Sequence, residues 1–559
     1  MKTRSIPLRI KNGDTKTNFK MMVEAIEEAK RDNIELLVFP EMALSGHMVG
    51  DRLHYGGFFC ELLNYNDKLI ELSEGLVLIW GNITIYESKL VKVGFVAENG
   101  KLLRSVNGDL YFVAVTRNEN IFEDEAYIVS GKKDKFRGLF KTSNNEMILL
   151  TVGNCWAIDN ILDDYEPADI IFVSIINEPY RYKQNEQIRD ILKDRQIFKD
   201  VIYCNRSGIE NNGKCFLVYD GKGAQELLND KATPIEELLD VLIDALQEFD
   251  RLILGSKAKW IIGLSGGLDS SINAALLHLA LGNKRIVGYS LPSAFNSTTT
   301  KNNAKLLARE LQIEFHEVAI GSLAETTIKL MEENSDIPIS AFNKENIQAR
   351  IRGNLLMNFA AHNGGVVINN GNKVESALGY YTLYGDSIGA FSPLADLLNI
   401  ELFELATAIN QRYGRVIIPE NLIPKNIGYS FEFVTAPSAE LTDGQKDPMK
   451  WGYHDLLIED LLKYRLTDIY PLLRAYKENR WQYIELGKWC EKAIASNREF
   501  AEDFRFILTN ISRSIFKRIQ GAPILSLSDS TIGLYHKENQ GGLIFTDAEE
   551  KLLNEIENS

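Results

Sequence analysis

Cysteine is scarce in this sequence, and long apolar runs are missing. The five cysteines among 559 residues are scattered, and none belongs to a Cys-x-x-Cys pair, which argues against a disulfide framework and against a structural zinc site. No apolar run approaches the ~20 residues that a membrane-spanning helix needs. The N-terminus also lacks the apolar core of a secretory signal. We therefore expect a cytoplasmic protein with no membrane partner.

An excess of positive charge is missing as well. The 77 acidic and 62 basic residues give a net charge of −15, which disfavours a broad nucleic-acid-binding surface because such a surface needs clustered lysine and arginine. The seven histidines show no His-Glu-x-x-His spacing, the pattern of one common metal site. A pocket for a small anion stays open, since it needs only a few local cations.

Two α/β patterns follow each other along the chain. Strand-like apolar runs and helices with one apolar face occur over about the first 220 residues, with a shortened first strand at 8–10. A second pattern begins at Trp260, where a strand, a glycine loop, a helix and a strand at 285–291 form the βαβ unit of a parallel sheet. We expect domains at 1–228 and 256–530, a helical linker at 229–255 and a C-terminal tail at 531–559.

The loop Ser265–Ser271 (SGGLDSS) lies between a predicted strand and a predicted helix. Free backbone N–H groups and the helix dipole at such a junction favour a phosphate. Gly266 and Gly267 let the backbone approach a phosphate, and Asp269 can hold Mg²⁺ against the same phosphates. The spacing is not that of the Walker loop. The alternative is a Ser/Gly turn that only closes the strand–helix junction.

The loop resembles the SGGxDS loop of the ATP pyrophosphatases, and five segments that follow it narrow the resemblance. These segments are 345–352, 371–380, 382–386, 437–441 and 517–520. In this order they are similar to the signature series of glutamine-dependent NAD⁺ synthetases. The resemblance implies a Rossmann-like (adenine nucleotide alpha hydrolase) parallel-sheet domain. It also implies that ATP adenylates the nicotinate carboxylate of deamido-NAD, and that ammonia then attacks the adenylate to give NAD.

The resemblance assigns roles to single residues. ATP is expected at Ser265, Gly266, Gly267, Asp269, Ser270, Ser271 and Thr382, and Mg²⁺ at Asp269 and Glu375. The substrate is expected at Arg350, Arg352, Tyr384, Asp386, Glu440 and Lys517. Two positions depart from the family pattern. Asn399 stands where a lysine usually contacts ATP, and Pro448 stands where a glutamate is usual; Lys373 or Lys517 is a candidate replacement for the missing cation.

The first α/β pattern resembles the nitrilases, which implies an α/β sandwich. Glu41, in the segment Val38–Gly46, matches their general base, and Cys155 matches their nucleophile. The segment Ile176–Tyr180 is similar to a later block near the glutamine site. The lysine block fails, because Val113 stands at the lysine position and no lysine occurs from 102 to 131.

Two hypotheses follow for this half. One keeps a glutaminase with an unusual triad. The other, which the sequence favours, is a degenerate nitrilase fold retained for assembly of a homo-oligomer, with the synthetase half taking free ammonium. Two broader alternatives stay open for the whole chain. One is an amide synthetase repurposed for another carboxylate, as Asn399 and Pro448 suggest; the other is a catalytically impaired family member with a scaffold role.

Overall fold

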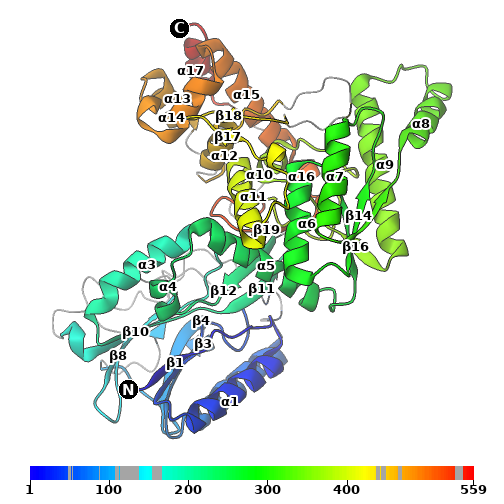
Figure 1. Ribbon diagram of the computed structural model, residues 1–559. Coiled ribbons are helices and arrows are strands. Elements are labelled where there is room, and N and C mark those ends of the chain that lie inside the picture. Colours follow the sequence, from blue (N-terminus) through cyan, green and yellow to red (C-terminus); the bar gives the residue numbers. More distant parts are fainter. Residues whose placement is uncertain are drawn as a thin grey trace. The chain divides into compact units, whose positions relative to one another are not determined.

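The computed structural model shows two compact units (Figure 1). The first comprises 1–212 and 217–234, and the second comprises 213–216 and 235–559. The structure describes residues 1–47, 49, 52, 55–86, 89–106, 112–113, 138–153, 166–213, 215–435, 441, 448–463, 469–534 and 545–559. The helix that the sequence predicts as a linker belongs almost entirely to the second unit.

The first unit is built from two sheets with helices outside them. Its elements are β1 (Thr3–Ser5), α1 (Thr15–Arg31), β2 (Leu36–Val38), α2 (Gly56–Leu72), β3 (Val77–Tyr86), β4 (Lys89–Glu98), β5 (Lys101–Leu102), β6 (Phe112–Val113), β7 (Leu139–Lys141), β8 (Met147–Val152), β9 (Ile170–Ile175), α3 (Gln184–Asp194), β10 (Asp200–Cys204), β11 (Ser207–Asn212), β12 (Cys215–Asp220) and α4 (Ala224–Asn229). One sheet has the order β1-β2-β3-β4-β5, with β6 on β4, and the other has the order β10-β9-β8-β7.

Alternating residues make this unit a four-layer sandwich. Leu36, Val38, Val77, Ile79 and Val96 of the first sheet pack in one cluster with β8, β9 and β10. The opposite faces of the same strands pack against α1 and α2 in the first sheet and against α3 and α4 in the second. The period of two along each strand produces both faces. The expected α/β sandwich is confirmed.

The first strand differs from the sequence-based expectation. It lies at Thr3–Ser5, where it pairs in parallel with Leu36–Val38, and 8–10 form no strand. Pro7 explains the difference, because proline has no backbone N–H to continue the ladder.

The second unit contains a parallel sheet followed by a helical region. Its elements are α5 (Pro234–Leu252), β13 (Lys259–Gly263), α6 (Leu268–Leu281), β14 (Ile286–Ser290), α7 (Thr298–Glu310), β15 (Glu314–Glu317), α8 (Gly321–Glu333), α9 (Ala341–His362), β16 (Gly365–Val367), α10 (Lys373–Leu378), α11 (Asn399–Tyr413), β17 (Lys425–Asn426), β18 (Phe431–Glu432), α12 (Tyr453–Lys463), α13 (Ile469–Lys477), α14 (Glu485–Ala493), α15 (Asn497–Arg513), α16 (Ile515–Arg518), β19 (Ile524–Ser526) and α17 (Asp547–Glu557).

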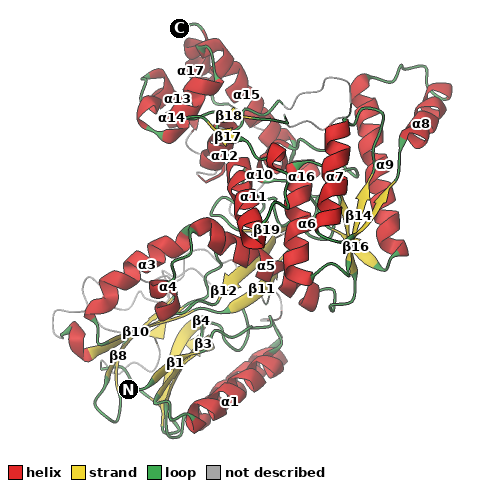
Figure 2. Ribbon diagram, viewed as in Figure 1, coloured by secondary structure: helices red, strands yellow, loops and turns green. Residues whose placement is uncertain are grey.

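The sheet order of the second unit, β15-β14-β13-β16, places a site. All three pairings are parallel. The chain runs from β13 outward to β14 and β15 and then returns to the other side of β13 as β16, with helices beside the sheet (Figure 2). In open α/β sheets, ligands bind outside the carboxyl ends of the strands where the order reverses. Here that position lies beyond Gly263 and Val367. The Rossmann-like expectation for this half is confirmed.

The helices after β16 have a core of their own. Residues from α10, α12, α13, α14, α15 and α17 share one apolar cluster. Leu552, Leu553 and Ile556 of α17 belong to that cluster, so this stretch of the predicted tail packs against the second unit's helices.

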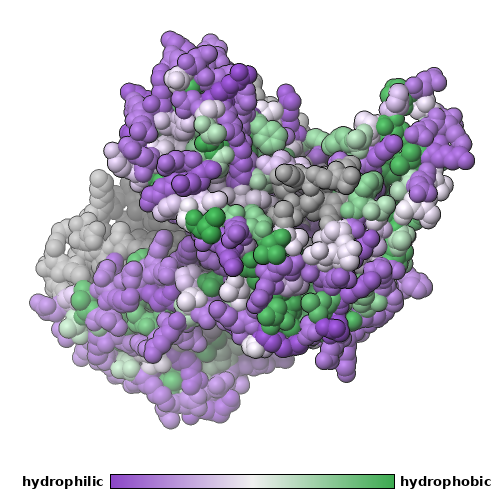
Figure 3. Space-filling view, turned by 45° about the horizontal axis from the view of Figure 1, so that its top comes forward, coloured by the Kyte–Doolittle hydropathy of each residue, from purple (hydrophilic) through white to green (hydrophobic). Residues whose placement is uncertain are grey.

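Polar residues dominate the face shown in Figure 3, and hydrophobic residues form small patches on it. Among the described helices, none is long and apolar enough to cross a membrane.

Candidate active site

A cavity of about 520 Å³ lies where the strand order reverses. Its lining includes the loop after β13, the residues that follow β16 and the first turn of α7. Asparagine side chains tie the two strand ends together. Asn370 Nδ2 donates to the carbonyl of Gly263 at 3.0 Å, and Asn273 Nδ2 donates to the carbonyl of Asn369 at 3.0 Å. The cavity floor is thus fixed by hydrogen bonds between adjacent strands.

The predicted phosphate loop lines this cavity. Gly266 has φ +83°, and a Cβ there would lie 1.9 Å from the carbonyl oxygen of Thr300, so the position requires glycine. Gly267 is the N-cap of α6, which points the free N–H groups of the first turn toward the loop. Ser265 Oγ accepts from Gly267 N–H at 3.1 Å and lies 3.1 Å from Ser270 Oγ. The serines therefore hold the loop in shape.

The two predicted metal ligands meet through one asparagine. Asp269 and Glu375 both line the cavity. Asn372 Nδ2 donates to Asp269 Oδ2 at 3.1 Å, and Asn372 N–H donates to Glu375 Oε2 at 3.1 Å. Asn372 is also the N-cap of α10, where its Oδ1 accepts from Glu375 N–H at 3.0 Å. Two carboxylates on one cavity wall suit a hard cation that takes further oxygens from phosphates. No cluster of three or more metal-ligating side chains occurs among the described residues.

Three of the cations that line the cavity are held by backbone carbonyls. Arg352 Nε donates to Leu291 O at 3.0 Å. Lys517 Nζ donates to the carbonyls of Gly379 and Tyr381, both at 2.7 Å. Arg518 Nη1 donates to the carbonyl of Ala377 at 2.6 Å. These bonds position the charges against the cavity.

Lys301 is a fourth lining cation, which the sequence analysis missed. It lies in the first turn of α7, next to Thr300, whose carbonyl abuts Gly266. Within the parts of the chain that the structure describes, its ammonium has neither an ion pair nor a hydrogen bond. It is therefore available to a ligand anion at the phosphate loop.

The predicted substrate side of the cavity contains a facing acid and base. Thr382, Asp386 and Lys517 all line it, and Asp386 Oδ1 accepts from Thr382 N–H at 2.7 Å. Asp386 is open to the cavity but enclosed by protein atoms, and this desolvation raises the pKa of its carboxyl. Desolvation also lowers the pKa of Lys517, partly opposed by the charge of Asp386. Both shifts favour the neutral forms.

Other predicted site residues lie away from the cavity lining. Arg350 Nε donates to Leu383 O at 3.3 Å, and Arg350 is absent from the lining that contains Arg352. Tyr384 is 62% exposed, and its hydroxyl donates to the side chain of Gln520. Glu440 lies outside the described residues. The structure therefore separates Arg350 and Tyr384 from the set that it brings together.

Asn399, which stands in the place of the family's lysine, lines the cavity and is held by Asp455. Its backbone N–H and its Nδ2 both donate to Asp455 Oδ1, at 2.6 and 3.1 Å. Lys373, one of the two proposed replacements, is buried in a separate network with Glu459 and two serines. Of the two proposed replacements, only Lys517 reaches the cavity.

In the first unit, Glu41 follows β2 and is buried, as a general base of the expected kind would be. Its Oε1 lies 3.7 Å from the Nζ of Lys92, a buried residue of β4 that the sequence analysis missed. Val113 belongs to β6, and Cys155 lies outside the described residues. A lysine thus lies beside Glu41, though from another strand than expected.

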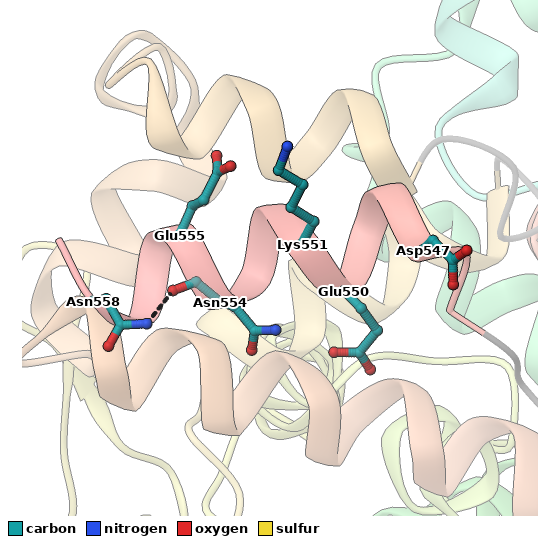
Figure 4. A pocket seen from close by; sticks show the side chains of 6 residues that line it. All are labelled: Asp547, Glu550, Lys551, Asn554, Glu555 and Asn558. Carbon is teal, nitrogen blue, oxygen red and sulfur yellow. Dashed lines mark hydrogen bonds between the residues drawn. The ribbon is translucent and has the colours of Figure 1, made fainter.

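A second depression, of about 570 Å³, lies on α17. Figure 4 shows its six lining side chains, all from this one helix and all polar. Two are engaged in ion pairs, Glu555 with Lys477 and Glu550 with Arg505. A single polar helix face offers none of the convergent groups found at the sheet.

Known proteins resemble both halves. The family model described as NAD synthase matches residues 237–475. The NH₃-dependent NAD⁺ synthetase of Pelodictyon phaeoclathratiforme is 33% identical over 37% of this chain and 68% of its own length. The glutamine-dependent NAD⁺ synthetase of Acinetobacter baylyi is 25% identical over 91% of this chain and 92% of its own. The structure of a glutamine-dependent NAD⁺ synthetase from Cytophaga hutchinsonii superposes with a TM-score of 0.73 at 15% identity, covering 99% of each chain.

Proposed function

The chain belongs to the NAD synthetase family, a family of ligases, and on that premise we propose that the cavity beyond β13 and β16 joins ATP to the nicotinate carboxylate of deamido-NAD. A carboxylate reacts poorly with ammonia, because the oxygen that must leave is a poor leaving group. Transfer of AMP to that oxygen supplies a good one, and attack by ammonia on the acyl carbon then gives the amide and AMP.

The single observation that carries the proposal is the convergence of groups in one cavity. Loop amides at Gly266 and Gly267, the carboxylates of Asp269 and Glu375, and several cations all line it. Amides at a helix N-terminus bind the pyrophosphate end of ATP. Thr382, Asp386, Arg352 and Lys517 then face the remaining volume, where the acid substrate is bound.

Mg²⁺ fits the carboxylate pair. Asp269 and Glu375 are tied to each other by Asn372 and supply hard oxygen ligands, while phosphates supply the remaining oxygens. Once bound, the ion would neutralise charge on the transferring phosphates. The protein's own share is to hold the two carboxylates at one wall and the loop amides at the other.

Lys301 takes the place of the cation missing at Asn399. Asn399 is committed to Asp455, whereas the Lys301 ammonium adjoins the loop through Thr300 and Gly266. A charge-assisted bond to a phosphate oxygen is worth about 1.5–3 kcal/mol. Lys301 and Lys517 therefore approach ATP and acid from two sides.

The test uses the full-length chain with ATP, Mg²⁺, deamido-NAD and ammonium. We expect AMP, pyrophosphate and NAD in equal amounts, measured by chromatography. AMP release with another carboxylate but none with deamido-NAD would support a repurposed amide synthetase. No AMP release with any acid would overturn the proposal and favour an impaired family member.

A further inference from the structure

A buried acid and a buried base meet in the first unit, which the synthetase chemistry does not use. Glu41 and Lys92 are 3% and 4% exposed, and Glu41 Oε1 lies 3.7 Å from Lys92 Nζ. His47 joins them, with its Nδ1 3.5 Å from Lys92 Nζ. Glu41 Oε1 has no hydrogen-bond partner. A buried carboxylate oxygen without such a bond is costly, and natural proteins keep one only for a reason.

Lys92 points into the space between the two sheets. Side chains two residues apart share a strand face, so Lys92, Gly94 and Val96 lie on one face of β4. Val96 belongs to the inter-sheet cluster, and a Cβ on Gly94 would lie 2.7 and 2.8 Å from the side chains of Leu150 and Val152. Lys92 therefore reaches toward the carboxyl end of β8.

Glu41 is fixed at the same end by its backbone. Met42 has φ +56°, an uncommon conformation for a residue with a side chain. A Cβ on Gly81 would lie 2.6 Å from the Cα of Glu41 and 3.2 Å from the Cδ1 of Ile175. The close approach of Gly81 and the strained Met42 thus aim Glu41 at the end of β9. Backbone strain of this kind occurs at functional sites.

An unpartnered amide lies just beyond that strand end. Asn177 follows β9 by two residues and is 7% exposed, and neither its Oδ1 nor its Nδ2 has a hydrogen-bond partner. Gly153 N–H donates to Ile175 O at 3.0 Å, which keeps the ends of β8 and β9 together. One acceptor–donor pair is therefore free beside a carboxylate and an ammonium, and a primary carboxamide offers the complementary pair.

We propose that Lys92 replaces the lysine missing at position 113 and forms, with Glu41, the acid–base pair of a site that hydrolyses a primary carboxamide of the glutamine type. The inference rests on the proposed function, because the ammonia released is the nitrogen donor that the second unit needs. It revives the glutaminase hypothesis that the sequence disfavoured. The lysine comes from β4, about twenty residues before the position where sequence comparison places it.

The chemistry balances without any added reagent. The proton of the attacking nucleophile passes to Glu41 as the nucleophile bonds to the carbonyl carbon. The carbon–nitrogen bond then breaks while Glu41 returns the proton to the departing nitrogen. The ammonium of Lys92 stabilises the negative charge that forms on the carbonyl oxygen. Overall one water and one carboxamide give one carboxylate and one ammonia.

The experiment compares glutamine with ammonium as the nitrogen source for the full-length chain. We expect the wild type to form glutamate and NAD from glutamine. Lys92→Met should lower kcat for glutamate release at least a hundredfold with little change in KM for glutamine, and should leave NAD synthesis from ammonium unchanged. Lys101→Met, on neighbouring β5, is the control and should change neither reaction.

Folding of the variant is checked by a second one. Glu41→Gln/Lys92→Met removes both charges, so no unpaired charge stays buried, and it should still make NAD from ammonium but release no glutamate. Glutamate release that survives in Lys92→Met would overturn the role of Lys92. A wild type that makes NAD only from ammonium would overturn this inference and leave the proposed function intact. Failure with both nitrogen sources would count against the proposed function itself.

Discussion

Each unit of the protein buries a lysine, and the two are held very differently. Lys373 Nζ lies 2.6 Å from Glu459, 2.6 Å from Ser530 Oγ and 3.0 Å from Ser528 Oγ. Lys92 Nζ lies 3.7 Å from Glu41 and 3.5 Å from His47. The first set has the lengths of strong charge-assisted bonds, and the second does not.

The contrast separates architecture from chemistry. Burial alone would lower the pKa of Lys373, but Asp396 and Glu459 outweigh it and keep the pKa above its ordinary value. Its charge is therefore permanent and serves the fold. The Glu41–Lys92 pair keeps a carboxylate oxygen without a hydrogen bond, as a group must that is to take up a proton during a reaction. A lysine at a substrate site is recognised by the contacts it does not complete.

The largest expected effect is on stability. Lys373→Met leaves Asp396 and Glu459 without their cation, and breaking such a buried pair costs about 3–5 kcal/mol. Urea unfolding followed by circular dichroism should show this loss. Lys92→Met should cost less, because only one carboxylate, at 3.7 Å, loses its partner. An equal loss in both variants would end the distinction between the two lysines.

The next effect concerns activity. Asp269→Ala removes a proposed Mg²⁺ ligand, and we expect AMP release from ATP and deamido-NAD to fall by about 10²–10³-fold. Glutamate release from glutamine should persist, which mirrors the expected result for Lys92→Met. Asp240→Ala, which removes a surface carboxylate paired with Arg412, is the control. Undiminished AMP release in Asp269→Ala would rule out its role at the phosphates.

A smaller effect is expected at the phosphate loop. Lys301→Gln should raise KM for ATP about tenfold, or about 1.4 kcal/mol, and change kcat little. Lys305→Gln is the matched control, because Lys305 lies one turn further along α7 and pairs with Glu317 at 2.9 Å. Steady-state kinetics with ammonium as nitrogen donor measures both. Equal KM values in the two variants would show that Lys301 does not contact ATP.

The smallest effect is a change in pH dependence. Burial raises the pKa of Glu401, a neighbour of the Lys373 network, to about 8 from an ordinary 4.5. A raised folded-state pKa adds stability below pH 4.5, and this stability is lost as the pH rises through 8. Glu401→Gln keeps the capping bond from Leu398 N–H and should remove that slope. Urea midpoints at pH 5 and pH 8 should then differ from wild type by on the order of 1 kcal/mol, while Glu404→Gln should follow wild type.

The sequence predicted well what depends on local pattern. The loop Ser265–Ser271 does close a strand and open a helix, and Asp269 and Glu375 do reach one cavity. Helix geometry also separates Arg350 from Arg352, because residues two apart on a helix diverge by about 200°. Only one of the pair can face the cavity, so that distinction was within reach of the sequence.

Contacts across strands were out of reach. Glu41 and Lys92 lie 51 positions apart and meet only because β2, β3 and β4 are neighbours in one sheet. A motif search looks for lysine at a fixed place in a block, and the block around Val113 has none. Lys301 escaped for a similar reason, since its link to Gly266 passes through the packing of α7. Assembly through the first unit stays a prediction.

One asparagine joins two tasks that are usually kept apart. Asn372 starts α10 with its Oδ1 and straps Asp269 with its Nδ2, and its backbone N–H holds Glu375. An exchange at this position therefore changes the helix terminus and the acidic wall together. In a survey of random substitutions, position 372 would score as intolerant whether cells were sorted by protein abundance or by growth without nicotinamide. Neither score alone would reveal which task had been lost.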